Sequence, residues 1–175
     1  LKRKCSTDAR VPSPRCFHSA FTDKSQNHLF VLGGSTSEEK HGSVIHRYDL
    51  RSNKWDIVTC LDMPPCIGHS SLLLPNQDLL LYGTHLSSDR HETAIPSDRC
   101  HVLGRTSKTS AIECKVLHTI GETPHARQHH GSVLVKNRMY IFGGWKPSSA
   151  QASNALYTLD LQKSEDSSGS RPGSR

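Results

Sequence analysis

The chain has 175 residues, of which 34% are hydrophobic and 22% are charged, and its formal net charge at pH 7 is +6. This length is sufficient for one domain with its own core, and the sequence has no run of 18 or more apolar residues that could span a membrane. The 12 glycines and 9 prolines indicate many turns. We therefore expect a turn-rich folded chain without a membrane partner.

Most of the excess positive charge lies at the two ends of the sequence. Residues 1–15 carry five basic residues and one acidic residue, a net charge of +4, and residues 161–175 carry +1. The 145 residues between them have 14 basic and 13 acidic residues. Because a nucleic-acid surface needs a basic stripe on a folded face, this balance argues against nucleic-acid binding. The alternative is that the basic N-terminal residues 1–10 bind nucleic acid.

The six cysteines, at positions 5, 16, 60, 66, 100 and 114, form no C-x-x-C pair and no regular framework. No charged-then-apolar signal segment opens the chain. Reduced thiols in a cytoplasmic or nuclear protein are therefore the expectation. The first residue is Leu1 rather than methionine, which hints at a fragment or a processed product.

Taken in order, the sequence begins with a basic and polar stretch, 1–11, which predicts a linker or a frayed strand. Regular patterning starts at residue 12. Apolar runs bounded by turn residues are typical of buried strands, so residues 12–60 predict one unit of four short strands. Their ranges are 18–21, 28–32, 44–50 and 53–58.

Two further units of similar pattern follow. The second, 61–120, predicts strands at 71–74, 79–82, 99–103 and 111–117. The third, 121–161, predicts three strands at 132–135, 139–142 and 156–161, with no fourth. Residues 162–175 are dominated by serine, glycine and charges, which predicts a disordered tail.

The three units share a motif at similar spacing: an arginine in the first and third units, then His-Ser or His-Gly, then an apolar run that ends at glycine. The motif residues, which we assign to the frame of each unit, are Arg15, His18, Gly33, Gly34, Tyr48, Trp55, His69, Gly83, Arg127, His130, Gly143, Gly144 and Tyr157. In the second unit Cys66 replaces the arginine and Thr84 the second glycine. Four-stranded units at a period near 50 residues are typical of β-propellers.

With its Gly pair, Tyr-Asp-Leu and Trp, this repeat resembles the kelch repeat, in the variety of host cell factor and the kelch-domain-containing proteins. The resemblance covers about residues 12–161. It implies an all-β fold of about three kelch-type propeller blades, each a four-stranded antiparallel sheet. Since related rings have roughly five to seven blades, we expect part of a larger propeller, a truncated product, or two half-rings that pair.

The edge where strand one begins and strand two ends should carry the binding loops, because variable loops on a rigid scaffold commonly hold partners. These loops are 35–42, 85–96 and 145–154, with the connectors 60–67 and 118–128. The candidate partner-binding residues are Glu38, Glu39, Lys40, His85, Arg90, Trp145 and Lys146. Exposed Trp and basic residues dominate interface energies, although Trp145 could instead pack on a neighbouring blade.

The sequence predicts no catalytic, metal-binding or cofactor-binding site. The repeated Arg and His side chains should hydrogen-bond to loop carbonyls rather than to a ligand, because buried polar groups must be satisfied. The His and Cys spacings do not assemble a zinc site, and no catalytic or phosphate-binding motif is present. We therefore predict no catalytic residue, metal or cofactor.

The resemblance implies a non-catalytic module that binds a peptide or folded protein partner as a substrate adaptor, for instance of a cullin-type ubiquitin ligase, or as a scaffold. The alternative is a kelch-type enzyme that acts on carbohydrates, resembling galactose oxidase or sialate mutarotase. The copper-ligand pattern of the oxidase is not recognisable in this sequence.

Overall fold

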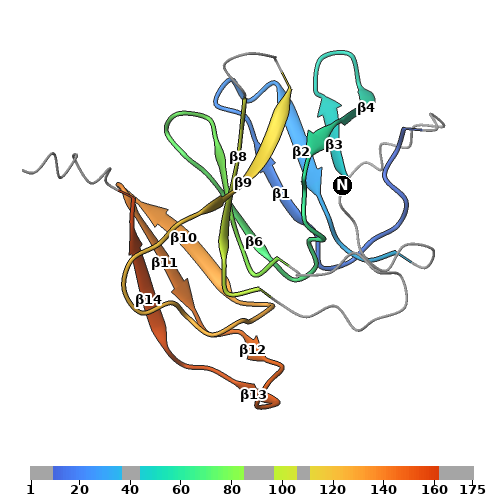
Figure 1. The fold of residues 1–175 in the computed structure, drawn as a ribbon. Coiled ribbons are helices and arrows are strands. Elements are labelled where there is room, and N and C mark those ends of the chain that lie inside the picture. Colours follow the sequence, from blue (N-terminus) through green and yellow to red (C-terminus); the bar gives the residue numbers. More distant parts are fainter. Residues whose placement is uncertain (1–9, 37–43, 85–96, 106–110, 162–175) are drawn as a thin grey trace, which may run out of the picture.

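The computed structural model describes residues 10–36, 44–84, 97–105 and 111–161. In these residues the chain is all-β, with no helix. Three sheets, antiparallel except for one short strand of the second, lie side by side, each the blade of a propeller-like arc (Figure 1). The predicted fold class is therefore confirmed. The described residues contain no helix that is long and apolar enough to cross a membrane.

Blade 1 is a four-stranded sheet whose strands follow one another in sequence order. It consists of β1 (Ser19–Thr22), β2 (His28–Leu32), β3 (Ile45–Asp49) and β4 (Lys54–Val58). These strands form from alternating or continuous apolar runs that are separated by polar turns, as expected. The bounds of each strand differ from the predicted range by at most one residue at either end.

Blade 2 contains the four predicted strands and one further strand. The four are β6 (Ser70–Leu73), β7 (Leu79–Tyr82), β8 (Cys100–Arg105) and β9 (Ile112–Leu117). The additional strand β5 (Cys60–Leu61) pairs in parallel with β9, on the outer edge of the sheet. The connector between blades 1 and 2 thus contributes to the sheet of blade 2.

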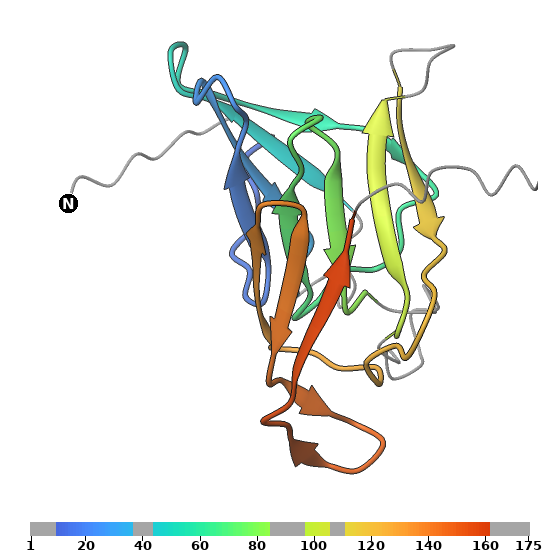
Figure 2. The same cartoon turned by 90° about the vertical axis from the view of Figure 1, so that its left-hand side faces the viewer.

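Blade 3 has three strands in the described residues, β10 (Gly131–Val135), β11 (Arg138–Phe142) and β14 (Leu156–Asp160). The predicted loop 145–154 contains a small ribbon formed by β12 (Trp145–Lys146) and β13 (Gln151–Ala152). Figure 2 shows this ribbon projecting below the blade.

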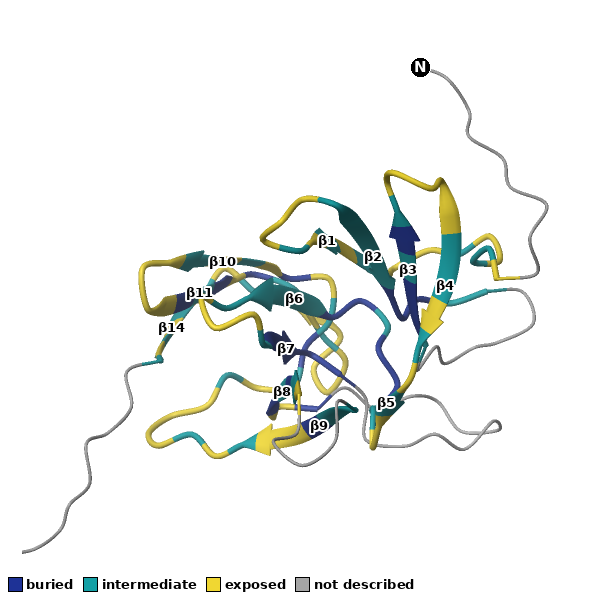
Figure 3. Cartoon of the chain, turned by 90° about the horizontal axis from the view of Figure 1, so that it is seen from above, coloured by how far each residue is buried: buried dark blue, intermediate teal, exposed yellow. Residues whose placement is uncertain are grey.

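The core lies between the blades, and β7 is at its centre (Figure 3). Because successive side chains of a strand point to opposite faces, β7 contributes to two separate clusters. Leu79 and Leu81 pack with Leu32 and Ile45 of blade 1. Leu80 and Tyr82 pack with Met139 and Ile141 of blade 3. Neither face of blade 2 is left open, and the stacking of neighbours supplies the core that one blade lacks.

Candidate functional site: the lower face of the blades

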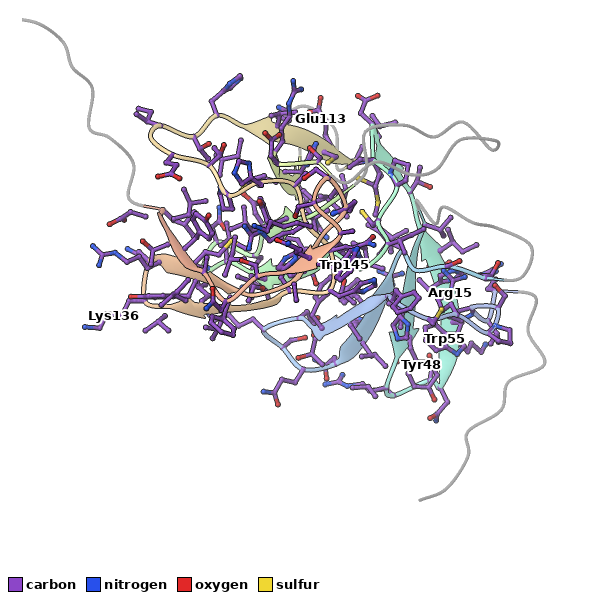
Figure 4. All side chains as sticks on the ribbon, turned by 90° about the horizontal axis from the view of Figure 1, so that it is seen from below. Arg15, Tyr48, Trp55, Glu113, Lys136 and Trp145 are labelled. Carbon is purple, nitrogen blue, oxygen red and sulfur yellow. The ribbon has the colours of Figure 1, made fainter. Side chains whose placement is uncertain are left out.

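The lower face is the side where the first strand of each blade begins and the second ends, and it faces downward in Figure 1. Three register pairs place these ends together, namely Ser19 opposite Leu32, Ser70 opposite Tyr82, and Gly131 opposite Phe142. The glycine turns follow directly after the second strands. Figure 4 views this face and shows Trp145 near its middle and Arg15 beside blade 1.

One residue from each blade, at equivalent positions of the repeat, contributes to a set of hydrogen-bonded residues at the inner part of this face. We call this set of three residues the inner turn. Phe17, Gly68 and His129, each directly before the motif histidine, have φ angles of 59°, 64° and 57°. The Gly68 N–H donates to the Phe17 carbonyl at 2.9 Å, and the His129 N–H donates to the Gly68 carbonyl at 2.7 Å. The Phe17 and His129 rings meet with centroids 4.6 Å apart.

Gly68 permits that aromatic contact. A Cβ atom at this position would lie 2.8 Å from Cε1 of His129, so a side chain there would displace the His129 ring. The sequence analysis did not predict this inner turn. The one signal in the sequence is that its three residues each directly precede a motif histidine. Phe, Gly and His share no chemistry, and only the repeat alignment could have related them.

The histidines connect successive blades. Ser19 Oγ and His69 Nε2 share a hydrogen bond of 2.8 Å, and Ser70 Oγ and His130 Nε2 share another of 2.8 Å. His69 and His130 are buried at these junctions, whereas His18, which has no blade before it in the structure, is exposed. A motif histidine therefore reaches back to the preceding blade rather than toward a ligand.

The motif arginines donate hydrogen bonds to the glycine turn that follows the second strand of their own blade. Arg15 Nη1 donates to the Gly33 carbonyl at 2.9 Å, and Arg127 Nη1 donates to the Gly143 carbonyl at 2.7 Å. Arg127 is fully buried, with its guanidinium carbon 4.8 Å from the centroid of the Tyr157 ring. Blade 2 has the buried Cys66 at the arginine position, and its buried Thr84 shares a 3.1 Å hydrogen bond with His101 Nδ1.

The remaining frame residues lie in the turns and on the third and fourth strands. The glycines at the ends of the second strands all have φ between 68° and 90°: Gly33, Gly34, Gly83, Gly143 and Gly144. Tyr48 lies opposite Trp55 across β3 and β4, with ring centroids 5.0 Å apart. Tyr157 is not the counterpart of Tyr48. In the strand register it takes the position of His46, and Leu159 takes that of Tyr48.

Two of the seven candidate partner-binding residues lie in described parts of the chain. Trp145 is 41% exposed, and its backbone pairs with Gln128 beside the inner turn through N–H···O bonds of 2.8 and 3.1 Å. Lys146 is half-buried. The other five, Glu38, Glu39, Lys40, His85 and Arg90, lie outside the described residues. The structure therefore places the Trp145 backbone beside Gln128, the residue that precedes His129 of the inner turn.

Titratable groups near the frame are held in their neutral forms. Burial, together with the charges of Arg127 and His129, lowers the pKa of His130 to about 4. Burial raises the pKa of the Cys100 thiol to about 11 and that of Cys114 to about 12, so these thiols are poor nucleophiles at neutral pH. In the described residues, no group of three or more His, Cys, Asp and Glu side chains could hold a metal ion.

The lowered pKa of His130 should make the fold sensitive to acid. In the unfolded chain an imidazole binds a proton near pH 6.5, whereas folded His130 stays neutral down to about pH 4. Below pH 6.5 the unfolded state therefore binds more protons, and the free energy of unfolding should fall by about 3 kcal/mol between pH 6.5 and 4. The pKa of His101 is also lowered, by burial and by Arg99, which adds to this slope.

Urea unfolding measured at intervals across this pH range tests the prediction. His130→Asn should flatten the dependence, because one buried imidazole is removed. His18→Asn is the matched control at the equivalent exposed position and should keep the slope of the unaltered chain. An equal slope in all three proteins would show that His130 is not the group that titrates.

Antiparallel blades of this order, joined by repeated hydrogen bonds around an inner turn, define a β-propeller repeat protein. Residues 14–61 match the family model for the Kelch motif. The match covers blade 1, and it supports a kelch-type repeat there.

Relatives and one solved structure agree with this assignment. Over 149 residues the chain is 24% identical to Kelch domain-containing protein 2 of Homo sapiens, with 80% of this chain and 35% of that protein covered. It is 28% identical to Kelch domain-containing protein 10 of Xenopus tropicalis, with 77% and 32% covered. It is 26% identical to Acyl-CoA-binding domain-containing protein 5 of Arabidopsis thaliana, with 84% and 21% covered.

The structure of YjhT superposes with a TM-score of 0.62 at 15% identity, and the match covers 86% of this chain and 50% of that one. At this identity the likeness concerns the fold. The chain therefore spans a fifth to about a third of the length of these relatives and half of the YjhT chain.

Proposed function

We propose that the chain is a non-catalytic module that binds a protein partner, a peptide or a folded domain, through its lower face, as an adaptor or scaffold. The observation that carries this proposal is that two large aromatic side chains, one on blade 1 and one on blade 3, are exposed on this face. Phe17 is 53% exposed and Trp145 is 41% exposed, and both are attached to backbone that hydrogen-bonds across the face. Large, rigid aromatic side chains are the commonest hot spots of protein interfaces.

The surrounding groups support binding rather than catalysis. His69 and His130 are engaged by serine hydroxyls of the preceding blade, and Arg15 and Arg127 by carbonyls of their own turns. A rigid frame of this kind lets a loop face present its side chains at little cost in conformational entropy. The five cysteines of the described residues are free thiols, which supports a cytoplasmic or nuclear location.

Substituting Trp145 tests the proposed face. Trp145→Ala should weaken a partner bound there by about 2 kcal/mol or more, roughly a factor of 30 in Kd, and circular dichroism checks that the variant remains folded. The matched control is Leu50→Ala. Leu50 is 42% exposed but follows β3 at the opposite end of blade 1, where Asp49 pairs with Lys54.

The measurement is quantitative affinity capture with the unaltered chain, Trp145→Ala and Leu50→Ala, followed by calorimetry with the purified partner. Partners that depend on the lower face should be depleted by Trp145→Ala alone. Equal recovery with all three proteins would contradict the proposal, and oxidase or mutarotase activity of the unaltered chain would favour the enzyme alternative.

A further inference from the structure

A groove of about 650 Å³ opens between blades 1 and 2. Its walls include the turn between β1 and β2 and the turn between β6 and β7, so it lies toward the end of the blades opposite to the lower face. Ligand pockets commonly have volumes of about 300–1,000 Å³ and form at the interfaces of structural units. The groove is therefore large enough for a small organic molecule, and it is separate from the proposed partner-binding face.

The walls of the groove are apolar along the strands. The apolar lining includes Phe21, Phe30, Ile45, Leu79, Leu103 and Ile112. The rings of Phe21 and Phe30 are stacked, with centroids 5.1 Å apart and an angle of 6° between their planes. Both side chains are half-buried, which leaves part of an aromatic surface facing the groove. This surface suits the flat ring of an aromatic ligand.

Two arginines, one on each wall, distinguish this junction from the junction of blades 2 and 3. By strand register, Arg47 of β3 has Val102 as its counterpart in blade 2. Arg105 of β8 has Leu161 as its counterpart in blade 3. Val102 and Leu161 both pack on the apolar cluster between blades 2 and 3. Between blades 1 and 2, the same two places are charged.

The positive charge near these arginines exceeds the negative charge. Arg47 Nη2 donates to Asp56 Oδ2 at 2.8 Å, and Asp56 Oδ1 also lies 3.6 Å from Arg10 Nη1. Arg105 is exposed and forms no ion pair within the described part of the chain. One carboxylate thus serves two arginines, and the third arginine has none.

The carboxylates that line the groove lie in its inner turns and are already engaged. Asp23 Oδ1 accepts hydrogen bonds from the N–H groups of Asn27 and His28 at 3.1 and 3.2 Å, and Asp23 Oδ2 lies 2.9 Å from His28 Nδ1. Asp78 Oδ2 accepts from Asn76 Nδ2 at 2.7 Å. These turns join the first and second strands, whereas the two arginines lie on third strands. The charges are therefore separated along the groove, and its outer end is positive.

We propose that the groove binds a small aromatic anion, a ring system that carries one carboxylate. The ring packs between the Phe21–Phe30 pair and the leucines of blade 2, and the carboxylate accepts hydrogen bonds from Arg47 and Arg105. Guanidinium groups are suited to this role because their donors match the two oxygens of a carboxylate. The occupant is an anion because the two arginines take the places of apolar residues without a carboxylate for each.

Competition with the fluorescent dye anilinonaphthalene sulfonate tests the proposal. The dye has the same chemistry, aromatic rings with one anionic group, and the unaltered chain should bind it saturably. Naphthoate should displace the dye at a concentration about tenfold lower than its neutral analogue naphthalenemethanol requires, because only the anion forms charge-assisted hydrogen bonds with the arginines.

The double variant Arg47→Val with Arg105→Leu gives this groove the apolar side chains of the second junction. The preference for naphthoate over naphthalenemethanol should then be lost. Arg138→Leu is the matched control, since Arg138 pairs with Asp160 on blade 3 at 3.1 Å, as Arg47 pairs with Asp56 on blade 1. This control should keep the preference. Circular dichroism checks that each variant is folded.

A preference for naphthoate that is lost in the double variant and kept in Arg138→Leu supports the site. The proposal is overturned if naphthoate does not displace the dye, if both compounds displace it equally, or if the preference persists in the double variant or disappears in the control. Stronger displacement by an acetylated peptide amide in which phenylalanine precedes aspartate would show that the groove takes a peptide, which also overturns the small-molecule assignment.

Discussion

Arg127→Met should lower the free energy of unfolding by about 3 kcal/mol, because it removes the donors of one buried and one half-buried carbonyl and leaves the buried one without its partner. The Arg127 guanidinium bonds to the carbonyls of Gly143 and His125 at 2.7 and 3.1 Å, and the side chain is fully buried. Methionine keeps most of the apolar stem but supplies no donor, so both carbonyls would lose their arginine donor. The contact with the Tyr157 ring would also be lost.

Arg15→Met provides the matched control for this prediction. Arg15 makes the equivalent bond, to the Gly33 carbonyl at 2.9 Å, but it is only half-buried, so water can replace the lost donor. We expect a loss of about 1 kcal/mol there. Urea unfolding followed by circular dichroism measures both variants. Equal losses would mean that burial does not determine the contribution of this arginine.

Gly83→Ala should destabilise the fold by about 3 kcal/mol or more, since a left-handed backbone and a steric clash coincide at this position. Gly83 has φ +79°, and a Cβ atom would lie 2.7 Å from Cε1 of His130 and 2.8 Å from the Arg127 carbonyl oxygen. The second of these atoms is backbone, so blade 3 would have to shift away from blade 2 to make room.

Gly121→Ala separates the cost of backbone strain from the cost of the steric clash. Gly121 has φ +98°, and its Cβ would meet nothing within 4 Å, so alanine there introduces backbone strain alone. A loss of about 1–2 kcal/mol is expected. Thermal and urea unfolding of the two variants give the comparison. If Gly83→Ala cost no more than Gly121→Ala, blades 2 and 3 would not be as closely packed as the structure shows.

Much of the architecture could be predicted from the sequence because the signals repeat. Apolar runs that stop at Gly33, Gly83 and Gly143 mark the second strand of each blade, and the structure has strands there. The short strand β5 was not predictable in this way. Cys60 and Leu61 carry no periodic pattern, and they are strand only because β9 lies beside them.

The candidate site was less accessible to sequence reasoning. Trp145 was identified by residue type, but its place depends on the ribbon β12–β13 and on pairing with Gln128, a contact between residues 17 apart. The inner turn of Phe17, Gly68 and His129 is defined by backbone conformation rather than by side-chain chemistry. Three unlike residues that share a left-handed φ angle leave no common pattern in a single sequence.

The two-sided burial of β7 has a consequence for how the protein is made. Leu79 and Leu81 can pack against blade 1 as soon as residues up to 82 have left the ribosome, but Leu80 and Tyr82 need Met139 and Ile141. At about 5–20 residues per second, roughly 60 further residues take about 3–12 s to synthesise. During that interval one face of the nascent second blade is apolar and uncovered, which makes it a natural substrate for chaperones that bind growing chains.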